Sequence, residues 1–364
     1  MSWAPIDDAF WRGRRVLVTG HTGFKGAWLS LWLQAMGAEL FGLSREAPTD
    51  PSLYALARVA EGMSGEVEGD IRDPAAVADA VAGTAPEVVL HLAAQPLVRR
   101  SFVDPQETFD TNVMGTVNVL DAVRATPGVR AVVAVTSDKC YENRGWEWGY
   151  REDEPMGGHD PYSASKGAAE LVISAYRRSF FSDPAGPALA SARAGNVIGG
   201  GDWGEDRLVP DLIRAGMEGE TVLIRNPNAV RPWQHVVSPL SGYLLLAQSL
   251  WASPSLAGGW NFGPEDADAR PVAWVVQALR ERWADKPSWR TDDGPHPHEA
   301  HYLKLDSSRA RLRLGWRPLA SLETALDSIV EWHEALVAGA DMREVTLRQL
   351  RELAGVHRPE TISR

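Results

Sequence analysis

The sequence predicts an α/β fold, in which a doubly wound parallel sheet is joined to a smaller, mostly α lobe. Three observations lead to this prediction. Short apolar runs alternate with helix-like segments in the first half of the chain, a glycine-rich turn follows the first run at Gly20, and the alternation stops after about Gly195. Alternating strands and helices form right-handed βαβ units, which place the strands parallel in one sheet.

Six strands are expected before the alternation stops. The apolar runs that predict them lie at residues 15–19, 39–43, 67–69, 88–92, 131–135 and 188–194. The first run ends at Gly20 and the third at Asp70, as expected for short buried strands bounded by turn residues. The helix after the first strand carries an apolar stripe from Trp28 to Met36, and further helices are expected at 74–81, 105–125 and 161–181.

The second half begins with three consecutive glycines at 199–201 and is irregular and rich in Gly, Trp and Pro. Two returns to the sheet are expected at 234–237 and 260–262, and helices at 272–283, at 322–337 and after about Gly339. We therefore assign residues 1–197 and about 234–263 to the sheet domain. Residues 198–233 and 264–364 are assigned to the lobe.

Composition excludes several classes of protein. Hydrophobic residues make up 44% of the 364 residues and charged residues 23%, which is typical of globular domains and not of disordered chains or fibres. The net charge of −11 would repel phosphate backbones, so nucleic-acid binding is not expected. The sole cysteine, Cys140, excludes an internal disulfide framework and a Cys-rich metal site.

The expected location is the cytoplasm. The N-terminus lacks the basic region and apolar run of a signal peptide. No apolar stretch approaches the roughly 20 residues of a membrane span. A single cysteine also suits a reducing compartment. We therefore predict a cytoplasmic protein with no membrane partner.

The turn between the first strand and the first helix carries Gly20, Gly23 and Gly26. Glycines in this place permit a tight turn and a close approach of the backbone to a pyrophosphate, and the helix N-terminus supplies N–H donors. The turn therefore predicts a dinucleotide site.

The end of the second strand carries Ser44 and Arg45, where NAD enzymes have an acidic residue that binds the adenosine ribose. Arg45 could bind the 2′-phosphate of NADP, or it could be a solvated loop residue. Asp70, at the end of the third strand, is placed either to bind the adenine amino group or to cap a turn. The sequence favours NAD and leaves NADP open.

Tyr162 and Lys166 are four residues apart, which puts both on one face of the expected helix. A lysine cation beside a phenol favours the phenolate and lowers its pKa. Tyr162 could then take a proton from a sugar hydroxyl as a hydride leaves. A surface pair without a catalytic role would have the same spacing.

A second polar group follows the fifth strand directly, with Thr136, Ser137, Asp138 and Lys139 in sequence. The carboxyl ends of parallel strands face the ligand crevice in this architecture. A hydroxyl, an acid and an amine are therefore expected to meet a ligand there, although a polar turn is the simpler alternative.

These motifs together carry a family resemblance. Gly20-x-x-Gly23-x-x-Gly26, Leu92-Ala-Ala-Gln95 and Tyr162-x-x-x-Lys166 resemble the extended short-chain dehydrogenase/reductase superfamily, whose dinucleotide domain is Rossmann-like. Longer strings at 20–29, 136–143, 199–203, 205–211 and 231–236 resemble more closely the branch of sugar-nucleotide 4,6-dehydratases that acts on CDP-glucose. The resemblance covers roughly residues 15 to 305.

The resemblance implies a lyase reaction without net oxidation. CDP-D-glucose would be oxidised at C4 with NAD as acceptor, water would leave across C5 and C6, and the hydride would return to C6, giving CDP-4-keto-6-deoxyglucose for deoxysugar biosynthesis. It implies that Tyr162 is the base, with its pKa lowered by Lys166. It further implies that Ser137 hydrogen-bonds the C4 oxygen and that Asp138 is the acid towards the C6 hydroxyl. Related dehydratases carry Glu in place of Lys139, so the C5 base stays open between Lys139 and another group.

The resemblance also implies two sets of binding residues. The cofactor set is Gly20, Thr22, Gly23, Phe24, Lys25, Gly26, Ser44, Arg45, Asp70, Ile71, Leu92, Ala93, Ala94, Gln95, Thr111, Thr136, Tyr162 and Lys166. The nucleotide-sugar set is Gln95, Ser137, Asn196, Arg207, Leu208, Val209, Arg231, Asn261 and His301.

Other functions stay open. A sugar-nucleotide 4-epimerase, or a dehydratase acting on another nucleotide sugar, would share the fold and the first hydride step, although an epimerase has no need of Asp138 and Lys139. A non-catalytic NAD-sensing protein could dispense with Tyr162 and Lys166, and a structural scaffold would need no glycine turn.

Two further expectations concern metals and partners. His296, His298 and His301 are too loosely spaced in a Pro-rich segment to predict a metal site. The helices expected at 105–125 and 161–181 are apolar enough, given the family resemblance, to predict a homodimer with a four-helix interface.

Overall fold

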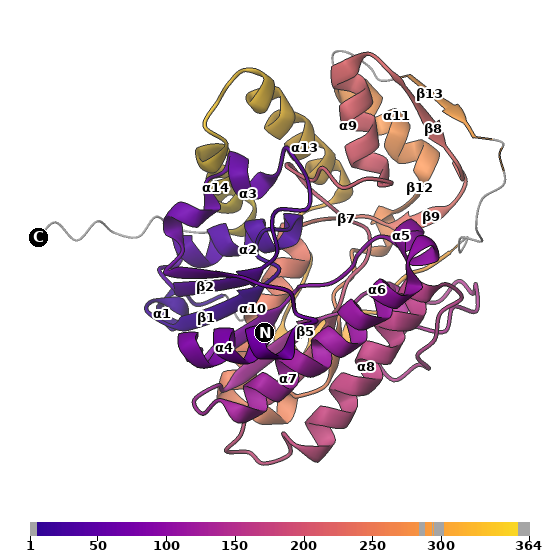
Figure 1. Ribbon diagram of the computed structural model, residues 1–364. Helices are drawn as coiled ribbons and strands as arrows, with labels where there is room; N and C mark the ends of the chain where they lie inside the picture. Colours follow the sequence, from indigo (N-terminus) through magenta and orange to yellow (C-terminus); the bar gives the residue numbers. More distant parts are fainter. Residues whose placement is uncertain (1–5, 284–287, 293, 295–301, 356–364) are drawn as a thin grey trace, which may run out of the picture.

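One parallel sheet of seven strands organises the chain (Figure 1). The structure is a computed structural model and describes residues 6–283, 288–292, 294 and 302–355. The sheet has the order β11-β6-β5-β4-β1-β2-β3, and all its pairings are parallel, which confirms the predicted fold class. The strands are β1 (Arg15–Thr19), β2 (Glu39–Ser44), β3 (Gly65–Glu68), β4 (Val88–His91), β5 (Ala131–Val135), β6 (Ala188–Arg193) and β11 (Gly259–Asn261).

The strand order reverses between β1 and β4. From β1 the chain moves outwards through β2 and β3, returns to β4 on the other side, and continues to β5, β6 and β11. Val16 of β1 therefore pairs with Leu40 of β2 on one side and Val88 of β4 on the other, and all three are fully buried. Such a reversal opens a crevice beyond the carboxyl ends of the strands.

Helices cover both faces of the sheet, which explains why its central strands are continuous apolar runs. One face is covered by α2 (Phe24–Ala35) and α10 (Val237–Ala252), whose buried side chains share a core with β1, β4, β5 and β6. The other face is covered by α4 (Pro74–Thr84), α7 (Gly115–Ala125) and α8 (Pro161–Ser179).

The lobe lies beyond the carboxyl ends of the strands and has a separate core (Figure 1). Its helices are α9 (Leu208–Glu218), α11 (Val272–Arg282) and α13 (Leu322–Val337). It also contains two strand pairs, the parallel β8 (Thr221–Ile224) with β13 (Ser288–Thr291) and the antiparallel β9 (Val230–Pro232) with β12 (Ala269–Pro271). Helices predominate in the lobe as predicted, but the sequence did not reveal these strands.

The remaining described elements are short or terminal. They are α1 (Asp8–Trp11), α3 (Leu53–Leu56), η1 (Val59–Gly62), α5 (Val98–Val103), α6 (Pro105–Phe109), η2 (Asp110–Met114), η3 (Asp138–Cys140), β7 (Val197–Ile198), β10 (Gln234–His235), η4 (Pro254–Leu256), η5 (Asp266–Asp268), α12 (Ser308–Leu314) and α14 (Met342–Ala354).

The long helix expected at 105–125 is interrupted. It divides into α6, the π-helical segment η2 and α7. The π turn lies where the side chain of Asn112 bonds inwards, donating to the carbonyl of Gln95 at 3.1 Å and to the hydroxyl of Ser165 at 2.9 Å. A π turn inserts one residue without ending the helix, so apolar periodicity alone does not reveal it.

Two segments pack differently from the sequence expectation. The return at 234–237 forms β10, which pairs with β7 and not with the main sheet. Helices α12 and α14 pack against α10, and α14 also packs against α2. These two helices therefore lie on the sheet domain, whereas the sequence assigned residues 264–364 to the lobe. The other domain boundaries stay a prediction.

In the described part of the chain, no helix is long and apolar enough to span a lipid bilayer.

Candidate active site

A cleft of about 1840 Å³ lies where the strand order reverses, between the strand ends and the lobe. This volume exceeds the roughly 300–1,000 Å³ of a pocket for one small molecule. It therefore has room for a dinucleotide and a second ligand side by side. All residues that the sequence assigned to catalysis and to the cofactor line this one cleft. The substrate-side residues that line it are Gln95, Ser137, Asn196, Arg207, Leu208, Val209 and Arg231.

The glycine turn is shaped by close backbone contacts. Gly20 has φ +77°, and a Cβ there would lie 2.8 Å from the backbone nitrogen of Ala93. A Cβ on Gly26 would lie 2.0 Å from the carbonyl oxygen of Gly20. A Cβ on Gly23 would meet nothing nearer than that carbonyl at 3.4 Å, so the turn is open on its other side. Since no side chain caps α2 at its N-terminus, its first N–H groups can donate to a pyrophosphate. The turn therefore fits a dinucleotide.

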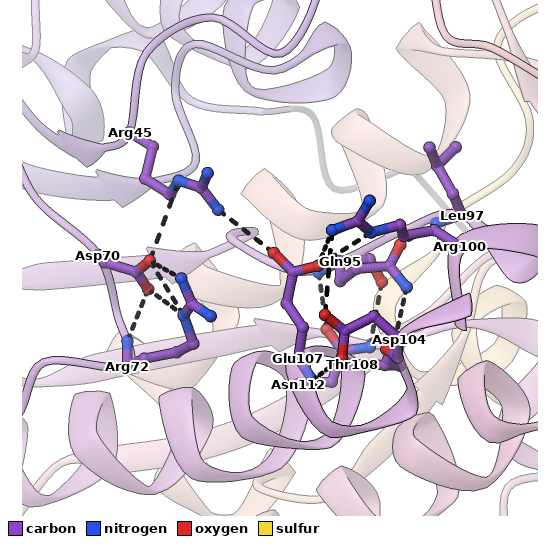
Figure 2. Close-up of polar contacts among 10 residues, drawn as sticks. All are labelled: Arg45, Asp70, Arg72, Gln95, Leu97, Arg100, Asp104, Glu107, Thr108 and Asn112. Carbon is purple, nitrogen blue, oxygen red and sulfur yellow. Dashed lines mark hydrogen bonds and ion pairs between the residues drawn. The ribbon is translucent and has the colours of Figure 1, made fainter. Parts of the chain in front are cut away.

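The adenosine end of the cleft carries paired charges (Figure 2). Arg45 lies 3.9 Å from a carboxylate oxygen of Asp70 and 3.7 Å from one of Glu107. Asp70 is also held by Arg72, whose guanidinium and backbone N–H both donate to it, and this hydrogen bonding lowers the pKa of Asp70. Because two carboxylates flank Arg45, this site is less favourable for a 2′-phosphate than a free arginine would be.

Gln95 has an internal role as well as a place in the cleft wall. Its side-chain nitrogen donates to the hydroxyl of Thr108 at 2.8 Å, and its side-chain oxygen accepts the N–H of Leu97 at 2.5 Å (Figure 2). These bonds fix the loop that follows β4. The predicted contacts of Gln95 with ligands would have to use its remaining hydrogen-bonding capacity.

Tyr162 and Lys166 lie one turn apart on α8, which begins with Asp160 as its cap and Pro161 in the first position. Both are at least nine-tenths buried. Burial raises the pKa of Tyr162 to about 12, against a smaller lowering by a hydrogen bond to Ser137 and by Arg207. Burial also lowers the pKa of Lys166 to about 8. Desolvation is the largest influence on the pKa of both groups, and the lowering of the Tyr162 pKa by Lys166 stays a prediction.

Asp138 is the buried acid of the cleft. The hydroxyl of Ser137 donates to its Oδ1 at 3.0 Å. Its Oδ2 is buried and has no hydrogen-bond partner among the residues described. The carboxylate packs against the backbone of Gly195, where a Cβ would lie 1.8 Å from Oδ2. Because Asp138 lines the cleft, this oxygen without a partner makes Asp138 a candidate for contact with a ligand hydroxyl.

Lys25 brings a second amine towards the catalytic residues. Burial, followed by the positive charge of Arg207, lowers the pKa of Lys25 to about 8, while Asp138 and Asp202 act in the opposite direction. Arg207 itself donates to both carboxylate oxygens of Asp202 at 3.0 Å. The sequence assigned Lys25 to the cofactor site. The charged residues that affect its pKa include Arg207, which was assigned to the substrate.

The substrate-side residues come from several segments of the chain. Arg207, Leu208 and Val209 form the start of α9. Asn196 has φ +49°, and its carbonyl accepts the N–H of Gln234 at 3.2 Å. Gln234, which the sequence did not single out, also donates from its side chain to the carbonyl of Gly195 at 3.2 Å. Gln234 could have been identified in the sequence because it lies within the segment 231–236 that carries the family resemblance.

Asn261 lies apart from the other residues predicted to bind the substrate. It does not line the cleft and is fully buried. Its side-chain nitrogen donates to the carbonyls of Tyr150 and Asp306, and its side-chain oxygen accepts the hydroxyl of Tyr141. These internal bonds occupy the amide. His301 lies outside the described residues, together with His296 and His298. No group of His, Cys, Asp and Glu side chains in the described ranges is arranged to hold a metal ion.

The fold and the cleft define a class of protein, and comparison with known families agrees. Residues 16–255 match the model of the NAD dependent epimerase/dehydratase family. The chain belongs to this family.

The comparisons also identify individual relatives. The chain is 54% identical over 351 residues to the CDP-glucose 4,6-dehydratase of Salmonella typhimurium, covering 95% of this chain and 97% of the relative. Among solved structures, it is similar to the dTDP-glucose 4,6-dehydratase DesIV of Streptomyces venezuelae, solved with NAD bound, with a TM-score of 0.74, 25% identity, and coverage of 90% of this chain and 99% of that one. The UDP-glucose 4-epimerase of Thermus thermophilus in complex with NAD has a TM-score of 0.74 at 26% identity and covers 87% of this chain and 98% of its own.

Substitution of Lys25 by Met should stabilise the protein near neutral pH. Below about pH 8 the lysine is charged in both the folded and the unfolded chain, and the folded state bears the full cost of its burial. The gain in the free energy of unfolding should be on the order of 1–2 kcal/mol. It should shrink as the pH rises from about 8 to 10.5, since Lys25 then loses its proton in the folded state first. Urea unfolding at several pH values measures this, and a gain that does not change with pH would contradict it.

Proposed function

We propose that this chain is a CDP-glucose 4,6-dehydratase, a lyase that converts CDP-glucose to CDP-4-keto-6-deoxyglucose. The observation that carries the proposal is the buried Asp138, bonded to Ser137 in the same cleft as Tyr162 and Lys166. Oxidation at C4 needs the tyrosine and lysine alone, whereas elimination of water also needs an acid. The 54% identity to the Salmonella enzyme supports CDP-glucose as the substrate.

The cofactor is NAD, held by the glycine turn and the start of α2. When bound, NAD accepts a hydride from the sugar and later returns it. Gly20 and Gly26 allow the turn to close tightly, and the N–H groups at the start of α2, which no side chain caps, would donate to the pyrophosphate. The two carboxylates beside Arg45 favour NAD over NADP.

We assign the removal of the proton from the C4 hydroxyl to Tyr162. Its pKa of about 12 in this state means that the phenol carries its proton at neutral pH. At neutral pH Lys166, with a pKa of about 8, is still mostly protonated, and its positive charge together with that of the oxidised cofactor would lower the pKa of Tyr162. Ser137, which hydrogen-bonds Tyr162, would orient the sugar oxygen.

We assign the elimination of water to Asp138 and to an amine. Asp138, whose Oδ2 has no hydrogen-bond partner among the described residues, would protonate the departing C6 hydroxyl. Lys139 lies in η3 next to Asp138, is half-buried and lines the cleft, so it stays our candidate for removing the C5 proton or for stabilising the enolate. A lysine base must be neutral, which requires desolvation or nearby cations.

A sugar-nucleotide 4-epimerase is the second candidate, because solved epimerases share this fold. An epimerase leaves C5 and C6 untouched and has no use for a buried acid with one free oxygen. Asp138 therefore favours the dehydratase.

We further propose a homodimer in the cytoplasm. Phe109, Met114 and Leu171 are large apolar side chains that are 38%, 50% and 63% exposed on α6, η2 and α8. A second copy of α7 and α8 would cover them in a four-helix interface. Light scattering should give twice the 39.8 kDa of the chain, and a species of 39.8 kDa alone would contradict the dimer.

The substrate assignment is tested by the product formed from each of four nucleotide sugars. Purified protein with NAD should convert CDP-glucose to a 4-keto-6-deoxy sugar that absorbs in alkali. It should act far more slowly on dTDP-glucose, UDP-glucose and GDP-mannose. Formation of a C4 epimer would favour the epimerase, and no product from any of the four would favour a non-catalytic NAD-binding protein.

Substitution of Asp138 by Asn should preserve oxidation at C4 and slow elimination by about 10²–10⁴-fold, the usual value of a general acid. Reduced cofactor should then accumulate when the variant is mixed with substrate, which is measured by absorbance. Gly195→Ala should give the same phenotype in milder form, because its Cβ would displace the carboxylate. If neither variant accumulates reduced cofactor while both remain folded, Asp138 is not the acid.

A further inference from the structure

The segment that carries Ser137, Asp138 and Lys139 is held at both ends. At one end, the hydroxyl of Thr136 donates to Oε1 of Glu170 at 2.5 Å. At the other end, the hydroxyl of Tyr141 accepts a hydrogen bond from Nη1 of Arg193 at 2.5 Å. The three residues proposed for C4 positioning and elimination lie between these anchors.

Glu170 and Arg193 join the two anchors to each other. Nε and Nη2 of Arg193 donate to the two carboxylate oxygens of Glu170 at 2.9 and 2.7 Å. The two side chains are only 4–5% exposed. Burial raises the pKa of Glu170, but Arg193 and the hydrogen bonds of Thr136 and Ser191 outweigh it, so the pKa is lowered and the carboxylate stays charged. In this buried ion pair, each charge is neutralised by the other, and two guanidinium nitrogens of Arg193 donate to the two carboxylate oxygens of Glu170.

The ion pair also connects the segment to the helix of the Tyr–Lys pair. Glu170 lies on α8 one turn after Lys166, so Tyr162, Lys166 and Glu170 follow one another at intervals of four residues. Arg193 is the last residue of β6, the strand next to β5. The pair therefore bridges α8, β6 and the segment after β5 beneath the floor of the cleft.

Asn261 completes the anchor at Tyr141. The Tyr141 hydroxyl donates to the side-chain oxygen of Asn261 at 2.7 Å. Asn261 in turn is fixed by its bonds to the carbonyls of Tyr150 and Asp306, at 2.7 and 3.1 Å. The hydroxyl of Tyr141 thus has a donor on β6, Arg193, and an acceptor on the edge strand β11, Asn261.

We propose that Glu170, Arg193 and Tyr141 are positioning residues that set the elimination residues in register with the Tyr162–Lys166 pair. The inference rests on the proposed function, because it assigns different steps to the two groups. Oxidation at C4 depends on Tyr162 and Lys166 of α8 and on Ser137, which directly follows the anchor of Thr136 on Glu170 and is four residues from Tyr141. Elimination depends on Asp138, which lies on the segment and three residues from Tyr141.

The test is Tyr141→Phe, which removes a single buried hydroxyl and keeps the ring that stacks on Tyr150. A small misplacement of a reacting group costs up to about 100-fold in rate, so we expect elimination to slow by about tenfold and oxidation by less than about twofold. Rapid mixing with CDP-glucose and NAD should therefore show reduced cofactor that builds up and decays slowly. With substrate deuterated at C5, the isotope effect on product formation should increase.

The matched control is Tyr243→Phe. Tyr243 is equally buried and also lies near Asp138 and Tyr162, but its hydroxyl has no hydrogen-bond partner within the described chain, so its loss removes no anchor of the segment and should not cause reduced cofactor to build up. Glu170→Gln and Arg193→Met each leave a buried charge unpaired, which could unfold the protein. The test of the positioning role therefore uses Tyr141→Phe.

The outcomes separate the inference from the proposed function. Build-up of reduced cofactor in Tyr141→Phe, but not in Tyr243→Phe, supports the positioning role. Equal loss of both steps in Tyr141→Phe, in a variant whose thermal unfolding is unchanged, would overturn the positioning role and leave the dehydratase assignment intact. No turnover of CDP-glucose by the unmodified chain would overturn the proposed function and this inference with it.

Discussion

The reversal of strand order between β1 and β4 determines where chemistry can take place in this molecule. It opens the crevice at the carboxyl ends of the strands. Each loop that leaves those ends then contributes one part of the site: the glycine turn after β1, the charged residues after β2 and β3, and the hydroxyl, acid and amine after β5. Helix α8 and the lobe close the crevice from the other side.

Burial gives the crevice its chemical character. It raises the pKa of Tyr162 and lowers those of Lys25 and Lys166, so that all three favour their neutral forms more than they would in water. The groups that are firmly charged are paired, such as Glu170 with Arg193 and Arg207 with Asp202. A site arranged in this way can respond strongly to the charge of what binds in it.

Much of this arrangement could be predicted from the sequence. The strands of the sheet and the motifs at their ends are local patterns, so the cleft residues from Gly20 to Lys166 were found. The π turn at Asn112, the pairing of β10 with β7 and the role of Asn261 could not be predicted, because each depends on partners far away in the chain. The same holds for Glu170 and Arg193, whose importance is visible only when four separate segments meet.

In the proposed reaction, one cleft oxidises the sugar, removes water and returns the same hydride to a different carbon. CDP-glucose labelled with deuterium at C4 tests this most directly, with the position of the label in the product determined by nuclear magnetic resonance and mass spectrometry. Deuterium should appear in the C6 methyl group of the 4-keto-6-deoxy product, without exchange with the solvent. Deuterium that stays on C4 of an epimerised sugar, or that is recovered in released cofactor, would contradict it.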